Sequence, residues 1–169
     1  MSVTKAVFTD VPELEKLVNS AYRGEESKKG WTSEASLLGG IRIDQPTLNA
    51  YLNDEKVTIL KHTSSNQQIT GTVYLENQGK SLYLGMLSVS PLAQGQNIGR
   101  TLLEQAETYA KALNCVKISM SVISVRTELI SWYERRGYVF TGERKPFEGI
   151  FGESDTGLEF IILEKNIIE

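Results

Sequence analysis

Two hydrophobic periods alternate along this chain, and each predicts a different secondary structure. Apolar residues spaced three and four apart indicate helices with one buried side, whereas strict alternation of apolar and polar residues indicates half-buried strands. The first period predicts helices over 10–22, 33–39, 46–53, 98–113 and 126–136. The second, together with short apolar runs between turn residues, predicts strands over 3–8, 57–62, 69–75, 82–89, 116–122, 138–145 and 158–164.

This order of elements predicts an α/β sandwich in which helices flank one mixed, twisted sheet. The strands between 57 and 89 follow one another through short turns as an antiparallel meander, whereas helices separate most other strands. We expect about six or seven strands, most of them antiparallel. The chain has 169 residues, no linker rich in Pro, Gly or Ser and no internal repeat, which predicts a single domain over 1–169.

Composition excludes several classes of protein. The single cysteine, Cys115, rules out an internal disulfide framework, suits a reducing compartment and is expected to be buried. The net charge of −3, without basic runs, argues against a nucleic-acid partner. No apolar stretch approaches the roughly 20 residues of a membrane span, and the N-terminus lacks a signal-peptide core. We therefore expect a cytoplasmic protein with no membrane partner.

The most informative segment is 86–103, MLSVSPLAQGQNIGRTLL, in which a turn leads directly into a helix. An apolar strand ends at Val89, Pro91 follows, and the glycine-bearing turn 94–99 precedes the helical pattern. Such a turn aims backbone N–H groups and the positive end of the helix dipole at one point, which favours a bound phosphate. The segment has neither the GKS or GKT of a Walker loop nor the GxGxxG dinucleotide fingerprint.

The turn resembles the Q/R-x-x-G-x-G/A acyl-CoA-binding motif of the GNAT acetyltransferase superfamily, through Gln94, Asn97 and Gly99. A second block, LISWYERRGY at 129–138, resembles the LYEKLGF helix and turn of the same family. Asn97 stands where the motif usually has glycine. Asparagine tolerates left-handed backbone angles and is a good helix N-cap, so we expect the motif to keep its function.

The resemblance implies a three-layer GNAT-like sandwich and acetyl-CoA as the co-substrate. No metal ion is expected, because the single histidine, His62, has no partner set for one. The strand matching 82–89 would carry a bulge and splay from the strand matching 116–122, and the pantetheine arm of CoA would enter that gap. Backbone groups of Leu87 and Val89 would contact pantetheine, and Arg100 would add a charge-assisted contact to a phosphate. The residues expected to hold the pyrophosphate are Gln94, Gly95, Asn97, Gly99 and Arg100.

Tyr133 has two interpretations. Its spacing from Leu129 and Ile130 is typical of a core side chain, whereas the resemblance implies a general acid that protonates the departing CoA thiolate. We favour the acid. The sequence has no Cys/His or Ser/His/Asp arrangement for a covalent intermediate, and His62, the only histidine, is expected at the surface. The implied reaction is therefore direct attack of a primary amine, of a small molecule or a peptide, on the thioester.

The acceptor side of the site is less defined. The strand SLYLGMLSV has no carboxylate that could act as general base, which leaves Glu34 and Glu76 as the nearest candidates by topology, with Glu34 favoured. Trp31, Thr32 and Arg42 are expected to bind the acceptor, Arg42 through an acceptor carboxylate. A structural role is an equal alternative: a hydroxyl residue just before Glu34 caps a short helix, and Trp31 packs on the core.

Two further questions stay open at this point. A non-catalytic acyl-CoA-binding module would have the same fold and cofactor site, and the missing strand carboxylate leaves room for it. The assembly state is also open, with a homodimer as one option.

Overall fold

The structure is a computed structural model that describes residues 2–22, 43–93, 95–146 and 159–167. Its centre is a seven-stranded sheet with the order β1-β2-β3-β4-β5-β7-β6. β4 and β5 pair in parallel, and every other neighbouring pair of strands is antiparallel. The strands are β1 (Ser2–Lys5), β2 (Val57–Thr63), β3 (Ile69–Asn77), β4 (Ser81–Val89), β5 (Lys117–Ile123), β6 (Val139–Pro146) and β7 (Glu159–Asn166).

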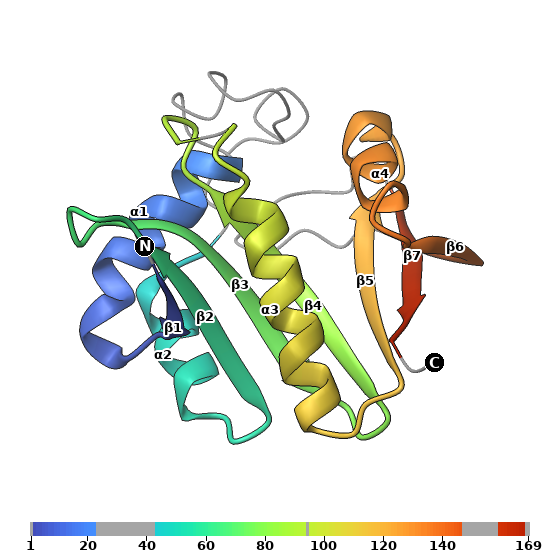
Figure 1. Ribbon diagram of the computed structural model, residues 1–169, viewed down its shortest axis with the longest axis horizontal. Helices are drawn as coiled ribbons and strands as arrows, with labels where there is room; N and C mark the ends of the chain where they lie inside the picture. The colour runs from blue at the N-terminus through green and yellow to red at the C-terminus, as the bar shows by residue number, and fades with distance from the viewer. Residues whose placement is uncertain (1, 23–42, 94, 147–158, 168–169) are drawn as a thin grey trace.

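Helices cover both faces of this sheet, which confirms the predicted three-layer α/β sandwich (Figure 1). They are a short 3-10 helix (Phe8–Asp10), α1 (Val11–Tyr22), α2 (Gln45–Asn53), α3 (Ile98–Ala112) and α4 (Thr127–Glu134). One buried cluster lies under α3, where Leu102 and Ala106 meet Leu75 and Leu84. The other lies between α1, α2 and the opposite face of the sheet. The predicted helix over 33–39 lies outside the described residues.

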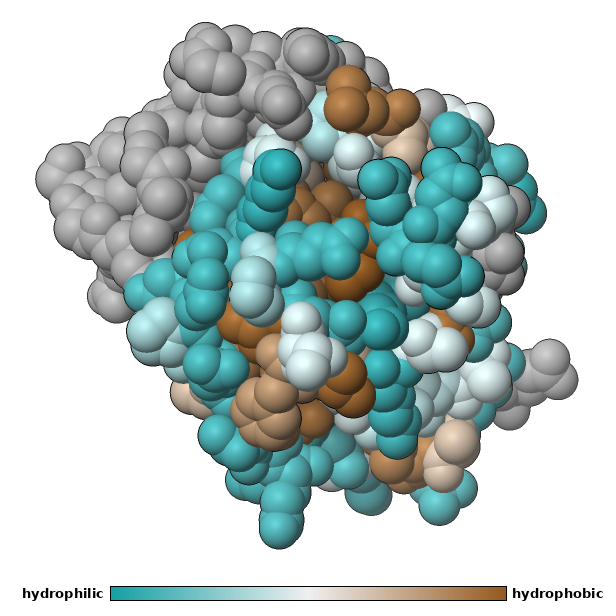
Figure 2. All heavy atoms as spheres, turned by 90° about the vertical axis from the view of Figure 1, so that its left-hand side faces the viewer, coloured by the Kyte–Doolittle hydropathy of each residue, from teal (hydrophilic) through white to brown (hydrophobic). Residues whose placement is uncertain are grey.

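The apolar stripes predicted for the helices face these two clusters. The five buried residues of α3 follow the helical period that predicted this element: Ile98, Leu102, Leu103, Ala106 and Ala110. One face of the molecule shows a correspondingly polar surface among the residues that the structure describes (Figure 2). In the view that faces the left-hand side of Figure 1, hydrophilic side chains predominate, and apolar ones occur in small separate groups among the atoms that are not grey (Figure 2).

Three local predictions are wrong. The first strand ends at Lys5 rather than at residue 8, because the Asp10 carboxylate accepts a hydrogen bond from the Val7 N–H at 2.8 Å and closes a tight turn there. Asp10 therefore ends the short 3-10 helix instead of capping α1. His62 is buried rather than at the surface, since β2 continues to Thr63 and is flanked by β1 and β3. Its Nδ1 lies 2.9 Å from the Thr70 hydroxyl, and burial lowers its pKa.

The middle of the sheet opens because β4 is bulged. Between the pairs Thr72–Ser88 and Tyr74–Gly85, β4 contains one more residue than β3, and Met86 has a positive φ of 54°. A bulge bends its strand and increases the local twist. β4 accordingly pairs with β5 only from Ser81 to Tyr83, and the two strands then diverge (Figure 1). The bulge and the splayed central strands implied by the resemblance are thus present.

Gly71 brings α3 close to the sheet beside this opening. A Cβ at Gly71 would lie 2.6 Å from the Ile98 side chain, 3.0 Å from Leu102 and 3.3 Å from the Ser88 carbonyl oxygen. Real Cβ atoms essentially never approach other atoms as closely as the first of these distances. Only glycine at this position therefore lets the first turn of α3 rest on β3, next to the end of β4.

Candidate active site

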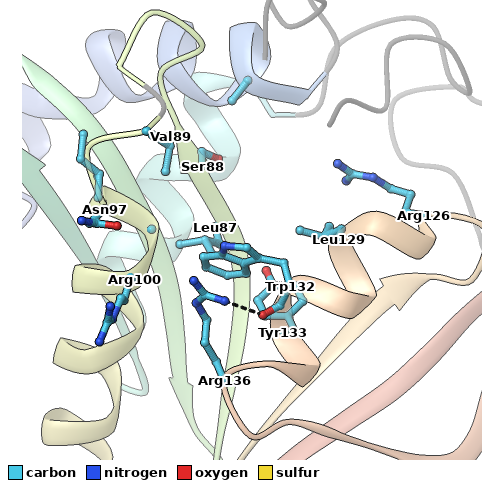
Figure 3. A pocket seen from close by; sticks show the side chains of 14 residues that line it. Leu87, Ser88, Val89, Asn97, Arg100, Arg126, Leu129, Trp132, Tyr133 and Arg136 are labelled. Atoms are coloured by element: carbon cyan, nitrogen blue, oxygen red, sulfur yellow. Dashed lines mark hydrogen bonds between the residues drawn. The ribbon is translucent and has the colours of Figure 1, made fainter. Parts of the chain in front are cut away.

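A pocket of about 270 Å³ occupies the opening between β4, the start of α3 and α4. Figure 3 shows its walls: the turn before α3 on one side, the end of β4 behind, and α4 on the other side. Most of the predicted cofactor-binding residues line it, together with Tyr133. They are Leu87, Val89, Gly95, Asn97, Gly99 and Arg100. The fold thus brings two sequence segments that the resemblance singled out to one cavity.

The start of α3 presents to this pocket backbone N–H groups that precede the helix ladder. Asn97 has the left-handed conformation predicted for it, with φ 61° and ψ 22°. It occupies the N-cap position, yet its side chain makes no capping hydrogen bond. The helix ladder begins with the Thr101 N–H, which donates to the Asn97 carbonyl oxygen at 3.0 Å. The preceding N–H groups therefore lie ahead of the ladder at the positive end of the helix, where an anion is stabilised.

The strand wall adds another donor. In an antiparallel pair, successive N–H groups of a strand point alternately toward and away from the neighbour. The Ser90 N–H donates to the Thr70 carbonyl oxygen of the β3 side at 2.9 Å. The N–H of Val89 therefore points the other way, into the opening where β5 has diverged.

Tyr133 belongs to the core and also lines the pocket, whereas its role as an acid stays a prediction. Its side chain is 5% exposed. Its ring meets the rings of Trp132 and Tyr138 edge-on, with centroids 5.2 and 5.9 Å apart. Packing from two sides holds the ring in one orientation. Core packing and a position at the cavity are therefore compatible.

Sequence reasoning missed four further pocket residues, which lie on α4 or directly beside its ends. Arg126, Leu129, Trp132 and Arg136 also line the pocket, as Figure 3 shows. The Arg136 guanidinium lies 4.0 Å from the centre of the Trp132 ring. Burial lowers the pKa of Arg136, and the charges of Arg135 and Arg100 lower it further. A signal was present, because a tryptophan and an arginine four residues apart share one side of a helix.

The remaining predicted residues are not part of the pocket as it is described. Gln94, Trp31, Thr32, Glu34 and Arg42 lie outside the described residues. Glu76, the second candidate base, pairs with Tyr83 at the end of β3 remote from Val89, and it is not a lining residue. Among the residues that the structure describes, no group of three or more His, Cys, Asp and Glu side chains is arranged to hold a metal ion.

Cys115 is buried, as predicted, with 1% of its surface exposed. Within the described ranges, no helix is both long enough and apolar enough to cross a lipid bilayer.

Solved structures resemble this fold over nearly its whole length. The ribosomal-protein-S18-alanine N-acetyltransferase of Escherichia coli aligns with a TM-score of 0.75 and 15% identity, over 99% of this chain and 94% of that one. The structure of yncA from Salmonella typhimurium, with its cofactor acetyl-CoA, aligns with a TM-score of 0.72 and 16% identity, over 100% and 95% of the two chains. Aminoglycoside 6'-acetyltransferase type Ii aligns with a TM-score of 0.71 and 16% identity, over 100% and 99%. At these identities the likeness establishes the fold.

The sequence itself identifies the family. No match was found among curated proteins. The family model described as an acetyltransferase (GNAT) domain, however, matches residues 35–152, which is more than half of the chain. The match contains both the turn before α3 and the α4 block that line the pocket. This chain therefore belongs to the GNAT family of acetyltransferases.

Proposed function

We propose that this protein transfers an acetyl group from acetyl-CoA to a primary amine of a small molecule or peptide. One observation carries the proposal: a single cavity joins the uncapped start of α3, the bulged end of β4 and Tyr133. A pyrophosphate, an extended pantetheine arm and a thioester follow one another in acetyl-CoA. The three parts of the cavity offer the matching chemistry in the same order.

The binding step uses mainly backbone. The N–H groups at the start of α3 bind the pyrophosphate, supported by Gln94 and Arg100. The pantetheine arm lies along Leu87 and Val89, on the side of β4 from which β5 has diverged. Binding through backbone fixes the thioester at a defined distance along β4, which is the positioning that a reaction between two bound substrates requires.

The chemical step is a direct attack of the amine on the thioester carbonyl carbon. The Val89 N–H stabilises the negative charge that develops on the carbonyl oxygen. When the carbon–sulfur bond breaks, the Tyr133 hydroxyl gives its proton to the sulfur, so that CoA leaves as the thiol. The amine loses a proton to a base, for which we propose Glu34. Trp31, Thr32 and Arg42 complete the acceptor side in this proposal.

The test is release of CoA thiol from acetyl-CoA in the presence of a panel of amines, polyamines, amino acids and peptides. Cys115 is buried, so a thiol reagent has little background from the folded protein. We expect release that depends on one class of amine and acetylation of that amine by mass spectrometry. CoA binding by calorimetry without release across the whole panel would favour the non-catalytic acyl-CoA-binding module. Absence of CoA binding would refute the assignment of the pocket.

A further inference from the structure

Arg136 is the residue of the pocket that the family block does not account for. The block LYEKLGF has leucine just before its glycine, and this chain has Arg136 there. A leucine at a partly buried position contributes packing, whereas an arginine brings a charge that must be compensated. The positive charge of Arg136 therefore needs a compensating partner.

The surroundings of Arg136 do not compensate it. Its Nη1 donates to the Trp132 carbonyl oxygen at 2.9 Å, and its guanidinium stacks on the Trp132 ring. Its Nε is buried without a hydrogen-bond partner. No carboxylate within the described part of the chain forms an ion pair with it. The nearby charges of Arg135 and Arg100 are of the same sign. The molecule thus holds an under-satisfied cation at the wall of a cavity.

Trp132 sets where that cation points. On one side the indole ring lies against α3, since a Cβ at Gly99 would be 3.3 Å from the ring. The guanidinium stacks on the same ring at 4.0 Å. Arg136 is therefore separated from the uncapped start of α3 by no more than one indole ring. Arg100, whose side chain is 62% exposed and pairs with Glu104, lies on the α3 side of the same opening (Figure 3).

We propose that Arg136, held by Trp132, binds a phosphate group of the nucleotide half of CoA, opposite Arg100. This inference rests on the proposed function, because it assumes that CoA occupies the pocket. A guanidinium offers paired N–H donors that match phosphate oxygens, and an anion there relieves the repulsion between the two arginines. The pyrophosphate and the 3'-phosphate share this chemistry, and the experiment distinguishes them.

The experiment measures affinity by calorimetry for CoA, 3'-dephospho-CoA and pantetheine. The variants are Arg136→Leu, which restores the residue of the family block, and Arg136→Lys, which keeps the charge. Arg135→Leu is the matched control, because it removes the same charge from the neighbouring exposed residue, which does not line the pocket. We expect Arg136→Leu to weaken CoA binding by about 10- to 100-fold. Arg136→Lys should lose less, and Arg135→Leu should stay within about twofold of the wild type.

Pantetheine, which has no phosphate, distinguishes the loss of a phosphate contact from a structural change of the pocket. If Arg136 binds phosphate, pantetheine affinity is unchanged in Arg136→Leu, and the salt dependence of CoA affinity becomes weaker. A loss that persists with 3'-dephospho-CoA assigns Arg136 to the pyrophosphate, and one that disappears assigns it to the 3'-phosphate. Equal losses for CoA and pantetheine, or unchanged CoA affinity in a folded Arg136→Leu protein, would overturn the inference while leaving the proposed function in place. A wild-type protein that binds no CoA would instead refute the proposed function.

Discussion

Removal of the Tyr133 hydroxyl alone tests the chemistry separately from the packing. Tyr133→Phe keeps the ring that packs edge-on against Trp132 and Tyr138. Such aromatic pairs are worth about 0.5–1.5 kcal/mol each, and the variant retains both. Only the hydrogen bonding of the hydroxyl is lost, at a net cost of about 1 kcal/mol. For a chain of this length, that cost lowers the Tm by about 2–4 °C.

The expected effect on the rate is much larger than the effect on stability. Positioned proton transfer contributes about 10²- to 10⁴-fold, which corresponds to about 3–5 kcal/mol of transition-state stabilisation. We expect kcat to fall by that factor while acetyl-CoA affinity changes little, since the lost interaction matters as charge builds on sulfur. The loss should be smaller with a thioester whose leaving thiol is more acidic.

Tyr138→Phe is the matched control within the same aromatic cluster. Tyr138 is 2% exposed, its hydroxyl has no hydrogen-bond partner, and it does not line the pocket. Its hydroxyl is therefore costly to bury, and the variant should be as stable as the wild type or more so, with unchanged kcat. The assay is thiol release beside thermal unfolding for each protein. A Tyr133→Phe variant with full activity and a rate limited by chemistry would show that another group or water protonates the thiolate.

Three further predictions concern the backbone around the pocket and the buried tyrosine. Gly71→Ala should reduce stability by about 1–3 kcal/mol and weaken CoA binding, because the added Cβ pushes Ile98 and the start of α3 off the sheet. Denaturant unfolding measures the stability and calorimetry measures the CoA affinity. Unchanged values of both would refute the close approach of α3 to the sheet. Asn97→Val should cost about 1–3 kcal/mol through its positive φ, whereas Asn97→Gly should be close to neutral; equal stabilities in urea would contradict the left-handed conformation. Burial, with a contribution from Glu107, raises the pKa of Tyr138, so its proton is favoured in the folded state. The stabilisation is complete below the pKa of the unfolded state, near 10, and is lost above it by about 1.4 kcal/mol per pH unit. In unfolding titrations between pH 10 and 11.5, the free energy of unfolding of Tyr138→Phe should therefore decline less than that of the wild type.

The spacing of hydrophobic residues was sufficient to predict an element where that element is long and packs on one side. The meander from β2 to β4 and helix α3 lie within a few residues of the predicted ranges, because each has one stripe that must be buried. The same reasoning failed at Asp10, where one side-chain hydrogen bond ends β1 early, and at His62, whose burial depends on the strands on either side. Such contacts cannot be predicted from the hydrophobic spacing within one segment of the chain.

Some residues of the candidate site could likewise be predicted from the sequence, and others could not. The turn at 94–100 and Tyr133 are readable because motif residues adjoin in sequence. The bulge at Met86 breaks the alternation at a single residue, which period alone cannot locate, and it was expected only from the family resemblance. Arg136 was overlooked because its place in the pocket wall depends on its stacking on Trp132 and on the approach of α3. The acceptor side at Trp31, Thr32, Glu34 and Arg42, and the homodimer, stay predictions.

The divergence of β4 from β5 places a strand border inside the molecule instead of at its rim. Strand borders at the rim are hazardous, because they recruit strands of other chains and lead to aggregation. Here α3 and α4 stand on either side of the entrance (Figure 1), so an incoming polypeptide strand with its side chains meets two helices first. The two helices therefore shield this internal strand border from the strands of other chains.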